Sequence, residues 1–149
     1  MSGLRRTMKA LALLLLFVGG VAFAAPEAGP TLGDKDWTAI RKVIGDQLAA
    51  LKAGDGEKAM TFAAPGIQAQ FGSAENFLRM VRAGYAALLD ARQTIFLQGA
   101  VIDDAVVQPL RLVLPDDSVL VALYQMQRQP DGRWRIAGCV IAPSTVQST

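Results

Sequence analysis

The first half of the chain has an apolar pattern typical of helices. Five apolar residues lie three or four positions apart, as on one face of a helix: Trp37, Ile40, Ile44, Leu48 and Leu51. Asp34 or Asp36 can cap the start of this helix, and the turn-forming residues 54–56 end it. The pattern therefore predicts one long helix that buries a single face.

Two further helices are predicted. The first covers 57–64 and stops at Pro65, because proline breaks a continuing helix. The segment 66–72, "GIQAQFG", is expected to be a linker whose Ile67 and Phe71 plug into the core. Ser73 then caps a helix that ends near Asp90. Its apolar face comprises Phe77, Met80, Val81, Gly84, Tyr85 and Leu88, and Gly84 suggests a close approach by another element.

The second half of the chain has the pattern of β-strands. Four strands are predicted, at 93–102, 105–115, 118–129 and 133–142. Helices followed by an antiparallel meander indicate an α+β fold, with the helices packed on a curved antiparallel sheet of four or more strands. Pro109 predicts an edge strand or a bulge. The single domain is expected to span 34–143, followed by a disordered tail at 144–149.

The amino terminus has the pattern of a secretory signal peptide at 1–24. A basic "MSGLRRTMK" precedes the apolar run "ALALLLLFV", and "AFA" ends the segment. Cleavage after Ala24 is predicted, followed by a flexible leader at 25–33. An uncleaved anchor remains an alternative, and the general and twin-arginine export routes remain open. The expected location is the periplasm or the exterior, with no stable membrane insertion after the signal is removed.

Removing the signal peptide changes the charge of the protein. The whole chain has a formal net charge of +2. Residues 25–149 contain 12 basic and 13 acidic residues, a net charge of −1. A nearly neutral domain without a basic run has no electrostatic footprint for nucleic acid, so we expect no nucleic-acid partner.

Several segments resemble an exported bacterial family known as domain of unknown function four-eight-six-four. The matching pieces are "FAAP", Ile67, Phe71, "FLRMV", "GY" and "DGRWRIAGC", within about 40–141. That family is similar to the nuclear-transport-factor-two-like superfamily, which includes ketosteroid isomerase and polyketide cyclases of the SnoaL type. The resemblance implies a cystatin-like cone of helices around a curved sheet. It leaves function open, because one fold hosts many functions.

The residue types restrict the chemistry. The chain has no histidine and one cysteine, which removes Ser–His–Asp and Cys–His catalysis and most zinc and iron sites. We therefore expect no metal and no cofactor. A mechanism of the ketosteroid isomerase type needs a carboxylate that faces the cavity, and no acid falls at an apolar position within a predicted element. No catalytic residue is assigned.

Three polar side chains lie among the apolar positions of the predicted elements: Gln47, Tyr85 and Tyr124. One interpretation is a closed core with satisfied tyrosine hydroxyls and a glutamine at its boundary. The other is a cavity that binds a small neutral ligand through one or two hydrogen bonds. These three residues are the candidate ligand-binding side chains.

The only cysteine lies in the last predicted strand. Strict alternation puts Trp134, Ile136, Gly138 and Val140 on one face and Arg135, Ala137, Cys139 and Ile141 on the other. Cys139 is therefore expected to be buried and inert. Because both faces are apolar near the end of the strand, a second subunit is expected to cover the face with Cys139, giving a homodimer through the sheet.

Three functions remain open at this stage. The leading hypothesis is a non-catalytic binding or accessory module with a cavity for a small apolar ligand. The alternatives are a small-molecule isomerase, cyclase or hydrolase of the ketosteroid isomerase type, and a structural dimerisation domain.

Overall fold

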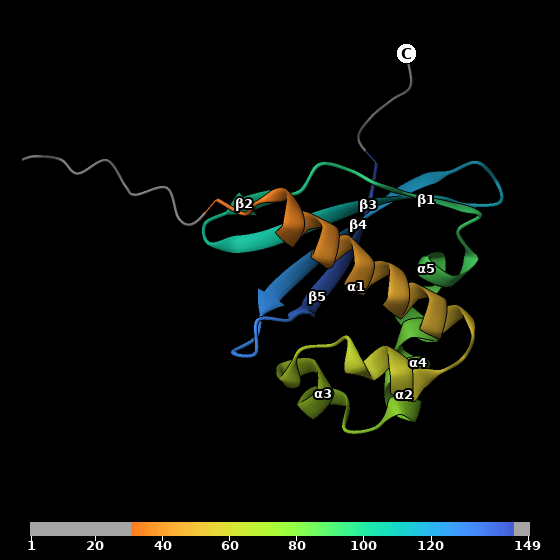
Figure 1. The fold of residues 1–149 in the computed structure, drawn as a ribbon. Coiled ribbons are helices and arrows are strands. Elements are labelled where there is room, and N and C mark those ends of the chain that lie inside the picture. The colour runs from red at the N-terminus through yellow and green to blue at the C-terminus, as the bar shows by residue number, and fades with distance from the viewer. Residues whose placement is uncertain (1–30, 145–149) are drawn as a thin grey trace, which may run out of the picture.

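The computed structural model describes residues 31–144 of the chain. The predicted signal peptide, most of the leader and the last five residues lie outside this range and stay predictions. Figure 1 shows the helices gathered on one side of a curved sheet. The α+β class with helices packed on an antiparallel sheet is confirmed. The elements are α1 Asp34–Lys52, α2 Gly56–Thr61, α3 Pro65–Phe71, α4 Ala74–Gly84, α5 Ala86–Asp90, β1 Gln93–Phe96, β2 Ala100–Ile102, β3 Ala105–Val113, β4 Val119–Arg128 and β5 Trp134–Pro143.

Helix α1 buries the predicted face, but its N-cap residue is Gly33 rather than Asp34 or Asp36. Asp34 and Asp36 occupy its first turn and Lys52 its last, an order that complements the helix dipole. The apolar face is buried, and Ile40 and Ile44 are fully shielded from solvent. The three-and-four spacing therefore predicted both the helix and the face that it buries.

Helix α3 occupies the segment that was expected to be a linker. Pro65 occupies the first helical turn, where its missing N–H leaves no bond unmade. Gly72 ends the helix with a φ of 71°, a backbone conformation that glycine adopts without strain. The prediction was wrong because Pro65 was interpreted only as a stop, although proline also begins helices.

The helix predicted to run from Ser73 to Asp90 is two helices. The Ser73 hydroxyl accepts the N–H of Asn76 at 3.2 Å and caps α4 as expected, but α4 ends at Gly84, and Tyr85 leaves helical geometry with a φ of −133°. Gly84 is exposed and faces open space, so the expected close approach there is wrong. The break instead positions the Tyr85 side chain to reach β5.

The sheet has the order β1-β3-β4-β5, and β2 also pairs with β3. All pairings are antiparallel. The single strand predicted over 93–102 is interrupted between β1 and β2. Gly99 lies in this gap. Only glycine fits there, because a Cβ would come within 2.2 Å of the Trp37 ring.

Pro109 lies opposite the same gap. Strand β3 is internal to the sheet, but residues 108 and 109 have no ladder partner on the side of β1 and β2, so the strand is locally an edge at Pro109, which is one of the two predicted alternatives. The carbonyl oxygen of Pro109 accepts the N–H of Leu97 at 3.1 Å. The interruption of the neighbouring strand accommodates a residue that has no N–H to donate.

Strand β5 contains a β-bulge that the alternation pattern did not reveal. Gly138 pairs with Gln125, whereas Ile136 pairs with the next residue of β4, so Ala137 has no partner in the ladder. An extra residue reverses the facing of the positions that follow it. Ile136 is buried beneath the helices before the bulge, and Cys139 lies on that same side after it.

The predicted dimer face is therefore wrong. Cys139 pairs with the buried Tyr124, and Ile141 pairs with the fully buried Ala122, so both lie on the helix side of the sheet with Ala137. Val140, on the opposite face, is 63% exposed. The inner face therefore includes Ile136 before the bulge and Cys139 and Ile141 after it, whereas Val140 lies on the outer face.

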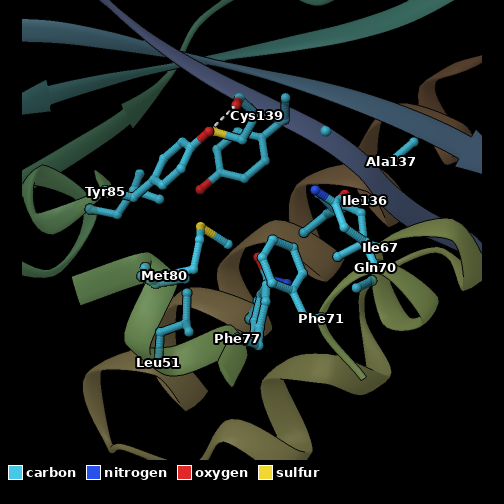
Figure 2. Close-up of a pocket in the computed structure, with 16 residues that line it drawn as sticks. Leu51, Ile67, Gln70, Phe71, Phe77, Met80, Tyr85, Ile136, Ala137 and Cys139 are labelled. Atoms are coloured by element: carbon cyan, nitrogen blue, oxygen red, sulfur yellow. Dashed lines mark hydrogen bonds between the residues drawn. The ribbon is translucent and has the colours of Figure 1, made fainter. Parts of the chain in front are cut away.

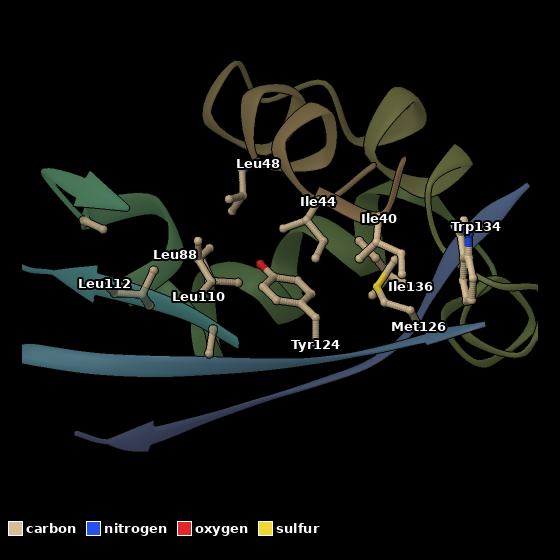
Figure 3. Close-up of a cluster of buried hydrophobic side chains, with 12 residues drawn as sticks. Ile40, Ile44, Leu48, Leu88, Leu110, Leu112, Tyr124, Met126, Trp134 and Ile136 are labelled. Carbon is tan, nitrogen blue, oxygen red and sulfur yellow. The ribbon is translucent and has the colours of Figure 1, made fainter. Parts of the chain in front are cut away.

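Two groups of buried side chains form the interior. Figure 3 shows the larger one, in which Ile40 and Ile44 of α1 lie over Leu110, Tyr124 and other inner residues of the sheet. The smaller group lies among α1, α2 and α4 and includes Leu51, Phe77 and Val81. The space between the two groups contains the candidate site.

Candidate functional site

A cavity of about 210 Å³ lies where α3, α4 and β5 meet. Figure 2 shows Phe77 and Met80 of α4 facing it from one side and Phe71 of α3 from another, with Cys139 of β5 beyond. Most of its wall is aliphatic or aromatic. Pockets that bind small molecules have this composition, with a few polar groups that orient the ligand.

The structure brings together all three candidate residues identified from the sequence. Gln47 comes from α1, Tyr85 from the break between α4 and α5, and Tyr124 from β4, and each lines the cavity. The sequence signal was a polar side chain at a position that the periodicity places in the core. The hydrogen bonds then distinguish the roles of the three residues.

The side chains of Tyr85 and Gln47 form hydrogen bonds within the protein. The Tyr85 hydroxyl donates to the carbonyl oxygen of Cys139 at 2.9 Å, a bond marked in Figure 2. Gln47 donates from Nε2 to the carbonyl oxygen of Ala59 at 3.2 Å, which ties α1 to α2. Both side chains therefore shape the wall through bonds to the backbone.

Tyr124 differs from the other two. Its side chain is 1% exposed, and its hydroxyl has no hydrogen-bond partner. Burial raises the pKa of Tyr124 well above its usual value, and the neighbouring Cys139 adds to the effect. The hydroxyl therefore stays protonated and keeps a proton that no protein group accepts.

Cys139 is a poor nucleophile in this setting. Its side chain is partly buried, and burial raises the pKa of the thiol from its usual 9.0 to about 12. The thiolate is the reactive form of cysteine, and at neutral pH it is absent in practice. The thiol therefore serves as a small apolar part of the cavity wall.

Helix α3 supplies lining residues at the outer part of the cavity. Ile67 and Phe71, one helical turn apart, both face it. Gln70, which sequence reasoning missed, is exposed and also lines it. Gln70 was not predicted because the segment was interpreted as a linker, so no helical face could be assigned to it.

The cavity has no group suited to acid–base chemistry at neutral pH. None of the described residues that line it is an aspartate, glutamate, lysine or arginine. Within 31–144, no cluster of histidine, cysteine and carboxylate side chains could hold a metal ion. The arrangement is suited to holding an uncharged molecule.

A larger hollow of about 550 Å³ lies at the far end of the sheet beside Trp134. It is open to solvent, and charged side chains there already pair with each other, as Arg128 does with Asp36. We favour the smaller cavity because none of its lining side chains is charged, whereas Asp36, Asp104 and Arg128 line the larger hollow, and because Tyr124, which lines the smaller cavity, has a buried hydroxyl without a partner.

The outer face of the sheet carries exposed apolar side chains. Leu123 and Val140 pair across β4 and β5 and are 39% and 63% exposed.

Within the described range, no helix is both long and apolar enough to cross a membrane.

Comparison with known proteins identifies a family. No curated protein and no solved structure matched the chain. One family model, described as Domain of unknown function (DUF4864), matches residues 33–149, which includes every element described above and all residues of the cavity. The chain belongs to this family.

Proposed function

We propose that this protein is an exported, non-catalytic binding module that holds a small, neutral and largely apolar molecule in the cavity between α3, α4 and β5. The observation that carries the proposal is a mainly apolar cavity of about 210 Å³ whose lining side chains include none that is charged. Export is supported by the sequence pattern of 1–24, which lies outside the described residues. The cone fold of the nuclear-transport-factor-two-like superfamily is part of the same proposal.

The size of the cavity limits the ligand. Pockets for drug-sized molecules occupy roughly 300–1,000 Å³, so a cavity of about 210 Å³ is small. An apolar cavity of about 150 Å³ is large enough to hold benzene. The expected ligand therefore has one ring or a short branched chain, with little room for further substituents.

The wall limits the charge of the ligand. A buried ion needs a partner of opposite charge or a dense set of hydrogen bonds, and the described lining residues offer no ionised side chain. Apolar contact contributes roughly 25 cal/mol per Å² of surface removed from water. Affinity is therefore expected to come mainly from the fit of the aromatic and aliphatic walls.

The alternative of an isomerase, cyclase or hydrolase is less well supported. Proton abstraction near neutral pH needs a group whose pKa lies near the working pH. The cavity groups with a resolved shift, Tyr124 and Cys139, have pKa values displaced upward, away from neutrality. Binding without chemistry fits these groups better.

A second candidate function is self-association through the outer sheet face. The observation in its favour is the adjacent exposed pair Leu123 and Val140, which lie opposite the helices. A second copy would remove these side chains from water. This candidate replaces the dimer through Cys139, whose side chain faces inward.

Native mass spectrometry of protein isolated from its own cells tests these proposals together. We expect a mass that begins after Ala24 and, for part of the sample, the added mass of a small molecule that gentle activation removes. A species that retains Met1 in the membrane fraction would contradict export. A monomer at micromolar concentration would exclude the second candidate and leave the first intact.

A further inference from the structure

The Tyr124 hydroxyl is an anomaly in an otherwise well-bonded interior. Among residues 31–144, two buried side-chain polar atoms have no hydrogen-bond partner, this hydroxyl and Nε2 of Gln129. Gln129 belongs to the β4–β5 hairpin, away from the cavity. Buried polar groups in native proteins nearly always have a partner. Tyr124 lines the cavity, so its unpaired hydroxyl points to a partner that comes from outside the chain.

The neighbouring polar groups do not satisfy this hydroxyl. The oxygen atoms of Tyr85 and Gln47 could act as acceptors, but neither accepts from the Tyr124 hydroxyl, and both side chains are held elsewhere by the bonds that they donate to the backbone. The Cys139 thiol is only a weak acceptor. The other lining side chains are apolar, as Leu88 and Ile136 are, except for the exposed Gln70.

We propose that Tyr124 is the specificity-determining residue of the cavity, and that its hydroxyl donates a hydrogen bond to one uncharged oxygen acceptor, a carbonyl above all, on a ring-sized ligand. The inference rests on the function proposed above and adds the chemical class of the ligand. The acceptor end lies against β4, and the apolar remainder contacts Phe71, Phe77 and Met80.

Two features favour an acceptor over other ligand groups. Burial holds the phenol in its protonated form, so a proton is available for donation at any physiological pH. A carboxylate or phosphate would need a cation, and no lysine or arginine is among the described lining residues. A saturated hydrocarbon would fit the walls and leave the hydroxyl unpaired.

The test uses two probes of nearly the same shape. Acetophenone carries a carbonyl oxygen, and in α-methylstyrene a methylene group replaces that oxygen. Binding of each is followed by NMR of protein labelled with ¹³C at the methionine methyl groups. Met80 lines the cavity and reports binding there, and its signal is assigned with a Met80→Leu variant.

The measured quantity is the ratio of the two dissociation constants. We expect the preference for acetophenone, relative to α-methylstyrene, to fall about 2- to 10-fold in Tyr124→Phe, the value of one neutral hydrogen bond. Comparing ratios cancels the different hydration of the two probes. Tyr85→Phe is the matched control, because its hydroxyl is already bonded to Cys139, and it should leave the ratio unchanged.

The outcomes separate this inference from the proposed function. If both probes shift Met80 and the ratio is equal in the wild type and Tyr124→Phe, the assignment of Tyr124 is overturned and the binding function stands. If neither probe shifts Met80 up to its solubility limit, the binding function itself is overturned. Unliganded Tyr124→Phe should melt at the same temperature as the wild type or higher, because it loses an unpaired hydroxyl.

Discussion

Two large aromatic residues on the inner face of the sheet, Trp134 and Tyr124, differ in packing and in hydrogen bonding. At one end, Trp134 packs in the core cluster with Ile40 and Ile136. Its indole N–H donates to Asp36 at 3.4 Å, and the Arg128 guanidinium lies 4.8 Å from its ring centroid. At the other end, Tyr124 borders a void, and its polar atom has no partner.

The difference indicates where the fold is stabilised and where it is open to a ligand. A side chain packed against its neighbours gains dispersion contacts, whereas the lining of a cavity loses some of them. An unpaired buried hydroxyl adds a further penalty of roughly 1–3 kcal/mol. A native protein tolerates such a combination where another molecule supplies the missing contacts, whereas the polar atom of Trp134 has a partner within the chain.

The largest effect is expected at Trp134. Trp134→Ala should lower the free energy of unfolding by about 3–5 kcal/mol, because it removes a buried indole and leaves a cavity. Val140→Ala on the outer face is the matched control, and it should change stability by less than about 0.5 kcal/mol. Urea denaturation followed by circular dichroism measures both. Equal destabilisation by the two variants would contradict the assignment of faces.

The sequence predicted much of this comparison from local patterns. The spacing of Ile40 and Ile44 identified the buried face of α1. The polar residues Gln47, Tyr85 and Tyr124 stood out because their positions belong to apolar faces. Their meeting at one cavity follows from α1, the α4–α5 break and β4 all contributing to the helix side of the sheet.

Features that depend on pairing between distant segments were missed. The bulge at Ala137 exists only in the register of β5 against β4, so strict alternation assigned Cys139 to the wrong face. The gap between β1 and β2 depends on contact between Gly99 and Trp37. Hydrogen-bond satisfaction also cannot be read from the chain, since Tyr85 and Tyr124 have the same chemistry and differ only in their neighbours.

The pH dependence of stability tests how well the cavity wall around Cys139 is shielded from water. The Cys139 thiol has a pKa of about 12 in the folded protein and about 9.0 when unfolded. Below pH 9 both states are protonated, so the full stability is present. Between pH 9 and 12 unfolding releases this proton, so stability should fall as the pH rises, by at most about 1.4 kcal/mol per pH unit from this group.

Cys139→Ala is the variant that isolates this effect. Its stability should fall less steeply than that of the wild type between pH 9 and 12, whatever its stability at pH 7. Tyr124, whose pKa is also raised, in part by Cys139, adds a slope of its own above about pH 10, where the unfolded tyrosine ionises, so the clearest comparison is between pH 9 and 10. Parallel pH profiles would show that Cys139 is well hydrated and that this end of the fold is not dry.

A crystal structure under xenon pressure tests the central claim most directly, because xenon enters dry apolar cavities that are large enough to hold it. The account predicts an anomalous xenon peak among Phe77, Met80 and Tyr124, with no protein group within hydrogen-bond distance of the Tyr124 hydroxyl. Side chains filling that volume, with the hydroxyl bonded to the protein and no xenon between α4 and β5, would contradict it.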